Sequence, residues 1–214
     1  MKTLLFANNK LTNFSSDKKL RIALILMILL SCALTAILQG GQFSFSSHYT
    51  KLFILSFFFL IYIVLLAYLK ISKQLTENSQ VFMILLLGVL LRCSYVLLSG
   101  LYDRQHDAGA YTGMGTSFVN PGHIGYIEYI YKFHKLPDLN PYELFAYYHP
   151  PLHHILSYLW LQFNIWLGVS EELAFENLQI LPLLYSCLSM TVTWKILKVL
   201  EVKGNGLIIG LAFM

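Results

Sequence analysis

Long apolar runs dominate the pattern of hydrophobic and polar positions along the chain. A helix that crosses a membrane needs about 20 apolar residues, because it rises about 1.5 Å per residue and the hydrocarbon core is about 30 Å thick. Runs that reach or approach this length lie at Leu20–Leu38, Leu52–Leu69, Val81–Ser99, Leu152–Val169 and Leu178–Leu197. The pattern therefore predicts an all-α fold, a polytopic transmembrane helical bundle with about five to six spans.

The last and the first apolar runs each leave two interpretations. A sixth run extends from Gly206 to Met214 and is too short to cross a membrane. We therefore expect the chain to be the amino-terminal part of a longer protein or a truncated gene product; the alternative is a short buried or interfacial tail. The first run has the basic flank of a signal peptide, but it exceeds the usual length of about 7–15 residues. We interpret it as a retained span.

The composition agrees with a membrane protein. Of the 214 residues, 57% are hydrophobic and 12% charged, against about 45–50% and about 25% in soluble domains. These values exclude a disordered chain and disfavour a soluble enzyme. The cysteines Cys32, Cys93 and Cys187 are too few for a disulfide scaffold, and we expect them to be reduced packing residues. No run of Lys and Arg exceeds two residues, so the net charge of +4 does not indicate nucleic-acid binding.

The distribution of Lys and Arg predicts the orientation of the spans. Basic residues precede the first run and follow the second, and both groups prefer the cytoplasm. The third span then leads outward, and the loop 100–150 lies outside. Alternation over five spans would place the acidic segment Ser170–Asn177 inside and the basic segment Lys198–Lys203 outside. Either the charge rule fails here, or Leu152–Val169 does not fully cross and is re-entrant or interfacial.

The outer loop concentrates the polar chemistry of the chain. Six of the seven histidines and three of the four aspartates lie between Asp103 and His154, together with many tyrosines. Connectors longer than about 12–15 residues are usually functional or disordered, and this one is too aromatic to be disordered. We therefore look for the functional site in this loop.

Within the loop, the stretch Gly122–Lys135 has the spacing of a short amphipathic helix. Its polar side is expected to carry Glu128, Lys132 and Lys135. We interpret it as an interfacial helix, with its tyrosines at the level of the lipid headgroups. The alternative is a helix packed on the outer domain of the protein itself.

The first polar motif, Tyr102–Tyr111, follows a span directly. Its carboxylates, Asp103 and Asp107, would lie at the membrane surface, where a carboxylate can take a proton from a hydroxyl or hold a divalent cation. The alternative is a polar turn in which Asp103 and Arg104 form a pair that faces water.

The second motif, Tyr147–His154, surrounds Pro150-Pro151. Proline is favoured in the first turn of a helix, so the pair predicts a helix start, with His149 near the N-cap and His153 on the same face. The amino end of a helix carries partial positive charge and free N–H groups, which suit a phosphate. The alternative role for a histidine here is a simple interfacial cap.

Arg92 interrupts the third apolar run. A charge within a membrane span is costly and usually faces a pocket or a partner. Arg92 therefore either supports a site, or snorkels or pairs structurally with a carboxylate.

Taken in order, these features resemble the membrane glycosyltransferases of the GT-C superfamily. The chain is most similar to the family 39-like group, which includes the protein O-mannosyltransferase and aminoarabinose transferase relatives. The features that carry this resemblance are the arginine-bearing span, the string Arg104-Gln105-His106-Asp107, the turn Leu136-Pro137-Asp138 and the helix start His149-Pro150-Pro151-Leu152. The resemblance covers about Val81–Met214. It implies an amino-terminal pair of helices over 1–80, the start of a transferase domain over 81–214, and a multi-pass location in a bacterial plasma membrane.

The resemblance also implies a mechanism. A polyprenyl-phosphate sugar would be the donor, and a hydroxyl of a lipid, glycan or protein would be the acceptor. By position Asp107 is the general base and Asp103 the second acid. The residues expected to bind substrate are Arg104, His106, Tyr111, His149, His153 and Arg92. Some relatives hold a divalent metal near the equivalent acid, and the sequence leaves open whether this chain binds one. No other cofactor is expected.

Other classes stay open beside the transferase. A catalytically inactive fragment or a membrane assembly subunit could have the same fold. A transporter or channel would place ionisable groups in the middle of the membrane, where Arg92 alone does so. A di-iron desaturase would need several histidine boxes, and the chain has one, His149-x-x-x-His153-His154.

Overall fold

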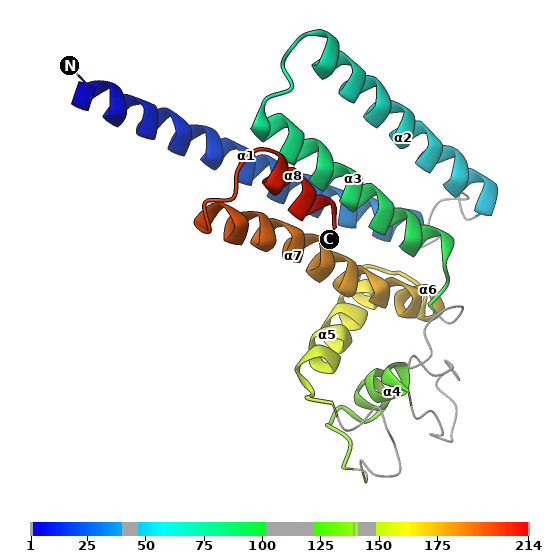
Figure 1. Ribbon diagram of the computed structural model, residues 1–214. Helices are drawn as coiled ribbons and strands as arrows, with labels where there is room; N and C mark the ends of the chain where they lie inside the picture. Colours follow the sequence, from blue (N-terminus) through cyan, green and yellow to red (C-terminus); the bar gives the residue numbers. More distant parts are fainter. Residues whose placement is uncertain (1, 40–46, 102–121, 139, 141–148, 214) are drawn as a thin grey trace. The chain divides into compact units, whose positions relative to one another are not determined.

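The computed structural model describes residues 2–39, 47–101, 122–138, 140 and 149–213, with side chains from residue 18 onward. All regular structure in these segments is helical (Figure 1). The elements are α1 Lys2–Gln39, α2 His48–Ile71, α3 Glu77–Leu98, α4 His123–Phe133, α5 Leu152–Trp166, α6 Glu171–Glu176, the 3₁₀ turn η2 Asn177–Gln179, α7 Ile180–Val199 and α8 Asn205–Ala212. The predicted all-α fold is confirmed for the part of the chain that is described.

Four helical segments in these ranges are long and apolar enough to cross a membrane: Lys18–Gln39, His48–Ile71, Glu77–Leu98 and Glu171–Val199. The run predicted as the fourth span instead forms α5, whose 15 residues rise about 22 Å, short of the hydrocarbon core. The run at the end of the chain forms α8, which has 8 residues. The described residues thus give four candidate spans, where the sequence predicted five to six.

A count of four spans would remove the conflict in the charge pattern. If α5 does not cross, the fourth span would run from outside to inside, with the acidic start of α6 outside and the basic end of α7 inside. Every basic flank, around Lys18, Lys70 and Lys198, is then cytoplasmic, as the charge rule requires. The second interpretation of the sequence, in which residues 152–169 do not fully cross, therefore agrees with both helix length and charge.

The described residues divide into two compact units. The first, which we call the span unit, contains residues 1–35, 48–95 and 183–214. The second, which we call the outer unit because it includes the segment that the sequence predicts outside, contains the described residues within 36–47 and 96–182. The predicted division at residue 80 stays a prediction.

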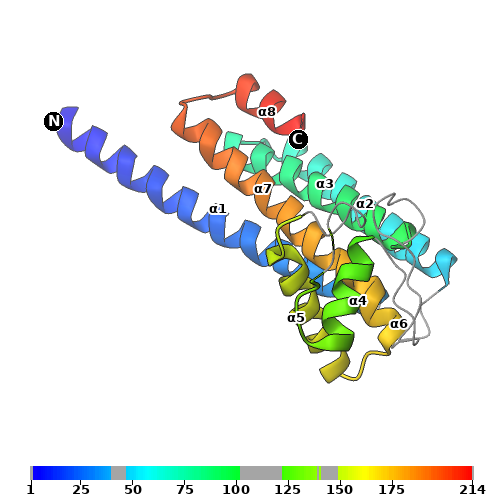
Figure 2. The same ribbon diagram turned by 90° about the horizontal axis from the view of Figure 1, so that it is seen from below.

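In the span unit, α3 and α7 approach closely because of a small residue. A Cβ atom added to Gly88 of α3 would lie 2.6 Å from Sδ of Met190 in α7. The buried core continues through Leu24, Val89 and Trp194, while most apolar side chains of α2 are exposed. Exposed apolar side chains on a helix of this length suit contact with lipid. Figure 2 shows α3 and α7 of this unit from below.

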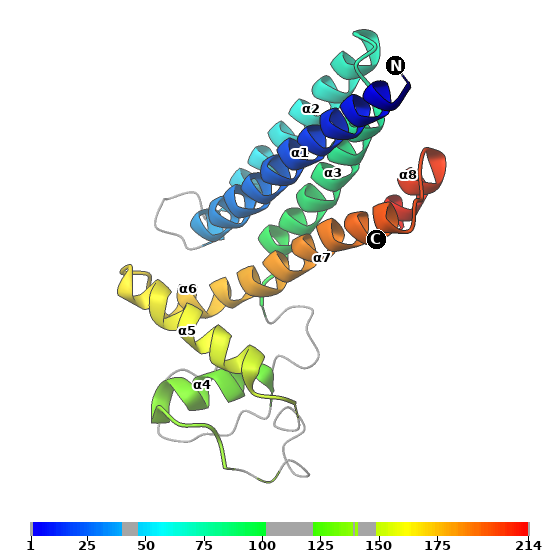
Figure 3. The ribbon, with the colours of Figure 1, turned by 90° about the vertical axis from the view of Figure 1, so that its left-hand side faces the viewer.

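In the outer unit, α4 packs on α5, and α6 closes the same core (Figure 3). The core contains Leu101, Ile124, Ile127, Leu161, Ala174, Phe175 and Leu178. Trp160 of α5 donates its indole N–H to the carbonyl oxygen of Asn177 at 2.8 Å, and the Asn177 amide donates to Oδ1 of Asn164 at 2.9 Å. The alternative in which α4 packs on the protein itself thus has direct support, whereas contact with lipid headgroups stays a prediction.

One carboxylate joins several chain segments in the outer unit. Oε2 of Glu176 accepts hydrogen bonds from the backbone N–H of Leu101 at 3.1 Å, from Nε2 of Gln179 at 3.4 Å and from Nε2 of Gln39 at 3.5 Å. Gln179 also donates to the carbonyl oxygen of Ser99 at 3.4 Å. The ends of α1 and α3 are therefore bonded to the turn between α6 and η2.

We predict the sidedness of the ends of the fourth span. Glu172→Cys should react with a membrane-impermeant maleimide in intact cells, and Lys203→Cys should react only after permeabilisation, because both positions are exposed at opposite ends of the span. The native chain is the background control, since its cysteines are buried. Labelling of Lys203→Cys in intact cells would show that the number of crossings is different.

We predict that Glu176→Ala lowers the midpoint of thermal unfolding by about 4–8 °C. The change removes an acceptor shared by three donors, a loss of about 2 kcal/mol, and about 1 kcal/mol moves the midpoint of a chain of this size by about 2–4 °C. Glu172→Ala, an exposed glutamate on the same helix, should change it by less than about 2 °C. Equal effects of the two substitutions would contradict this role of Glu176.

Candidate functional site

The candidate site is a histidine cluster where α4 and α5 begin. Nδ1 of His123, the first residue of α4, shares a hydrogen bond of 3.0 Å with Nε2 of His154 in the first turn of α5. The N-cap of α5 is Pro151, which makes no side-chain capping bond. The proline pair thus starts the helix as predicted, and the helix places His154 opposite the start of α4.

Aromatic stacking holds the rings of the cluster in place. The ring of Tyr126 stacks on that of His154 with centroids 4.0 Å apart and planes inclined by 15°. The ring of His149 lies 4.9 Å from that of His123, and the ring of His153 lies 5.9 Å from that of His154. The cluster therefore joins five rings from α4, α5 and the residues just before α5.

Burial shifts the pKa values of the cluster and so determines which of its groups are charged at neutral pH. His154 is only 1% exposed, and its pKa is lowered to about 4, first by burial and then by the neighbouring His123 and His153. Burial also lowers the pKa of His153, although its side chain is partly exposed, and raises the pKa of the Tyr126 phenol. Near pH 7, His154 is neutral and Tyr126 is protonated, so both act as hydrogen-bonding groups without charge.

The arrangement can offer N–H groups to an anion. Neutral imidazole has one N–H donor and one acceptor, and the bond between His123 and His154 fixes how these are shared. His149 is exposed beside this pair. Within the described segments, no three His, Cys, Asp or Glu side chains gather so that they could hold a metal ion. The divalent metal that the sequence left open therefore gains no support from these residues.

The predicted site residues fall into three groups. Asp103, Arg104, His106, Asp107 and Tyr111 lie outside the described residues. His149 and His153 both belong to the histidine cluster. The prediction that His149 lies near the N-cap is corrected, because the helix begins at Leu152 with Pro151 as its cap and His149 precedes the cap by two residues.

Arg92, the remaining predicted residue, lies in the span unit. Its Nε donates to Oγ of Ser186 in α7 at 2.7 Å, and its Nη1 donates to the carbonyl oxygen of Gly88 at 3.2 Å. These bonds satisfy polar groups within the membrane segment and join α3 to α7. A role of Arg92 in substrate binding stays a prediction.

Sequence reasoning missed three members or neighbours of the cluster. His123, Tyr126 and His154 were not among the predicted site residues, although His123 and Tyr126 belong to the Gly-His-Ile-Gly-Tyr string that begins at Gly122. Glu128, expected on the polar side of α4, is instead 4% exposed, so that part of the prediction is wrong. No local signal marked Glu128 as buried, because it shares its helical spacing with the polar residues Lys132 and Lys135.

Comparisons with known proteins add no assignment. No family model matches the chain, and neither a curated protein nor a solved structure shows significant similarity to it.

We predict that His154 makes stability depend on pH. Its pKa is about 4 in the fold and about 6.5 when unfolded, so between these values the unfolded chain binds more protons and stability falls as pH falls. From pH 7 to pH 5 the unfolding midpoint of His154→Gln should drop by about 4 °C less than that of the native protein.

His48→Gln is the matched control, since His48 is an exposed histidine of the span unit. It should follow the native protein over the same range. A curve for His154→Gln that runs parallel to the native one would show that His154 is not held neutral by the fold.

Proposed function

We propose that the protein is a glycosyltransferase that moves a sugar from a polyprenyl-phosphate donor to an acceptor hydroxyl at the outer face of the membrane. The acceptor is a lipid, a glycan or a protein. Asp107 is the general base, and Asp103 supports it. Arg104, His106 and Tyr111 bind the substrates together with the histidine cluster.

The observation that carries the proposal is the pairing of His123 with His154 beside His149. Three imidazoles meet at the amino end of α5, where partial positive charge and unbonded N–H groups favour a phosphate. The burial of His154 keeps it uncharged, so it serves to orient His123. His123 and His149 are then the groups that contact the donor phosphate.

The reaction needs one proton transfer and one departing phosphate. The acceptor oxygen attacks the anomeric carbon while its proton passes to the carboxylate of Asp107. The bond between the anomeric carbon and the phosphate oxygen breaks, and its electron pair leaves with polyprenyl phosphate. A positioned base contributes about 10²–10⁴-fold to such a step. Phosphate leaves without added protonation, and N–H donors stabilise the charge that develops on it.

The membrane segments suit a donor with a long prenyl chain. Four apolar helical segments among the described residues are long enough to cross a bilayer, and the main segment of the outer unit begins in the last turn of α3. A prenyl chain stays in the hydrocarbon region, so a site for its phosphate has to lie close to the membrane surface. In the orientation that we infer from the charge rule, the loop after α3 lies on the outer side.

We predict that Asp107→Asn lowers the rate of sugar transfer at least about 100-fold, because the amide cannot take the proton. The measurement follows consumption of a radiolabelled polyprenyl-phosphate hexose by membranes that contain the full chain. Asp138→Asn is the matched control: Asp138 is an exposed aspartate that follows α4, and its loss should change the rate by less than about twofold.

Two results would contradict the proposal. An unchanged rate for Asp107→Asn at equal protein level would remove Asp107 from the mechanism. Absence of transfer by the native chain would favour an assembly subunit or a transporter instead.

A further inference from the structure

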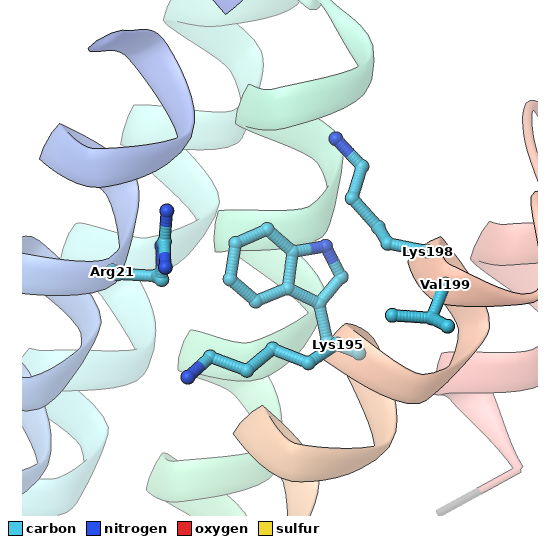
Figure 4. Close-up of a pocket in the computed structure, with 5 residues that line it drawn as sticks. Arg21, Lys195, Lys198 and Val199 are labelled. Carbon is cyan, nitrogen blue, oxygen red and sulfur yellow. The ribbon is translucent and has the colours of Figure 1, made fainter. Parts of the chain in front are cut away.

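A second polar site lies in the span unit, away from the histidine cluster in the sequence. Arg21, Trp194, Lys195, Lys198 and Val199 line a cavity of about 250 Å³ (Figure 4). Arg21 comes from the start of the first membrane span, and the other residues come from the last turns of α7. The cavity therefore lies where one span begins and another ends.

The lining of this cavity is strongly cationic. Three of its five residues carry a positive charge, and none is acidic. Figure 4 shows Arg21 on α1 and Lys195 on α7 extending into the same space. Nζ of Lys198 lies 5.9 Å from the centroid of the Trp194 ring, a distance at which the ring face attracts the cation. Like charges gathered in one cavity favour an anion between them.

The buried tryptophan provides a second sign of a ligand. Trp194 is 1% exposed, and its Nε1 has no hydrogen-bond partner among the described residues. A buried indole N–H normally finds an acceptor, because leaving it unbonded costs free energy. An anionic oxygen atom would supply the missing acceptor for this N–H.

The position of the cavity favours a lipid headgroup over a soluble ion as its ligand. Arg21 and Lys195 lie inside the membrane segments, not in the loops beyond them. Beside them, Ile22, Ile196 and Val199 are exposed apolar side chains, which suit contact with acyl chains. By the charge rule this end of the unit is cytoplasmic, and basic pockets between spans on that side bind anionic headgroups.

We propose that Arg21, Lys195 and Lys198, with the indole of Trp194, form a binding site for the phosphate headgroup of an anionic phospholipid in the cytoplasmic leaflet. The site is independent of the proposed transferase reaction, which we assign to the other face of the membrane. The bound lipid would join α1 to α7, because each helix supplies part of the charge that holds it.

The experiment compares two triple variants of the full chain in nanodiscs of phosphatidylcholine that contain a minor fraction of phosphatidylglycerol. The test variant is Arg21→Gln/Lys195→Gln/Lys198→Gln. The control is Lys70→Gln/Lys73→Gln/Lys203→Gln, which removes the same charge from exposed positions on the same predicted side. Native mass spectrometry counts the phosphatidylglycerol that each protein retains after extraction, and circular dichroism checks that each stays helical.

The native chain and the control should retain phosphatidylglycerol over phosphatidylcholine. Each basic residue near anionic lipid contributes about fivefold in affinity, so the test variant should bind about 100-fold more weakly. Equal losses of phosphatidylglycerol in both variants would show that only general surface charge matters, and would contradict the proposed site. Retention of phosphatidylcholine to the same degree, or displacement of the lipid by millimolar inorganic phosphate, would also overturn it, the latter in favour of a site for free phosphate.

If the test variant loses its helical content, single variants test whether the lipid site exists. Lys195→Gln alone, at an exposed position of α7, should weaken retention about fivefold, whereas Lys203→Gln should not. Equal retention by these two single variants would contradict the site.

Discussion

Hydrogen bonds to the carboxylate of Glu176 hold together the chain segments of the outer unit. It accepts hydrogen bonds from the backbone of Leu101 and from the side chains of Gln179 and Gln39. Leu101 is also a member of the buried core on which α4 packs through Ile124. The hydrogen bond from Leu101 to Glu176 therefore fixes the position of the chain where it leaves α3. Because Leu101 and Ile124 share the same core, this bond also helps to fix the position of α4. Because His123 begins α4, the geometry of the histidine cluster depends on this acidic group.

Local sequence patterns predicted the elements but not all of their roles. The apolar runs identified the helices now seen as α1, α2, α3 and α7, and the spacing of residues 122–135 identified α4. The run at 152–169 was predicted as a span because its mean composition is apolar. Yet His154, Ser157 and Asn164 are buried polar residues on one side of α5, a stripe that suits packing within protein. The helix ends at Trp166, before Gly168 with its φ of +83°.

The site was less predictable because its contacts join residues that are distant in the sequence. The hydrogen bond between His123 and His154 links positions 31 residues apart, and periodicity places a residue on a helix face without showing what it faces. Burial of His154 and Glu128 likewise follows from packing between elements. The acidic motif from Asp103 to Asp107 lies outside the described residues, so its role rests on the resemblance and the chemistry of its residue types. The two proposals assign separate roles to the two units: donor chemistry to the outer unit, and lipid binding to the part of the span unit where Arg21 and the last turns of α7 lie.

We propose that the histidine cluster contacts the phosphate of a polyprenyl-phosphate donor. The most direct test is the ¹⁵N spectrum of histidine imidazoles in the full chain in nanodiscs, assigned by single His→Gln variants, as polyprenyl phosphate is added. If the cluster contacts the phosphate, the ring-nitrogen signals of His123 and His149 should shift at saturation, those of His154 should keep the signature of a neutral ring, and those of His48 should not change. Unchanged spectra for His123 and His149 at saturating polyprenyl phosphate would contradict this proposal.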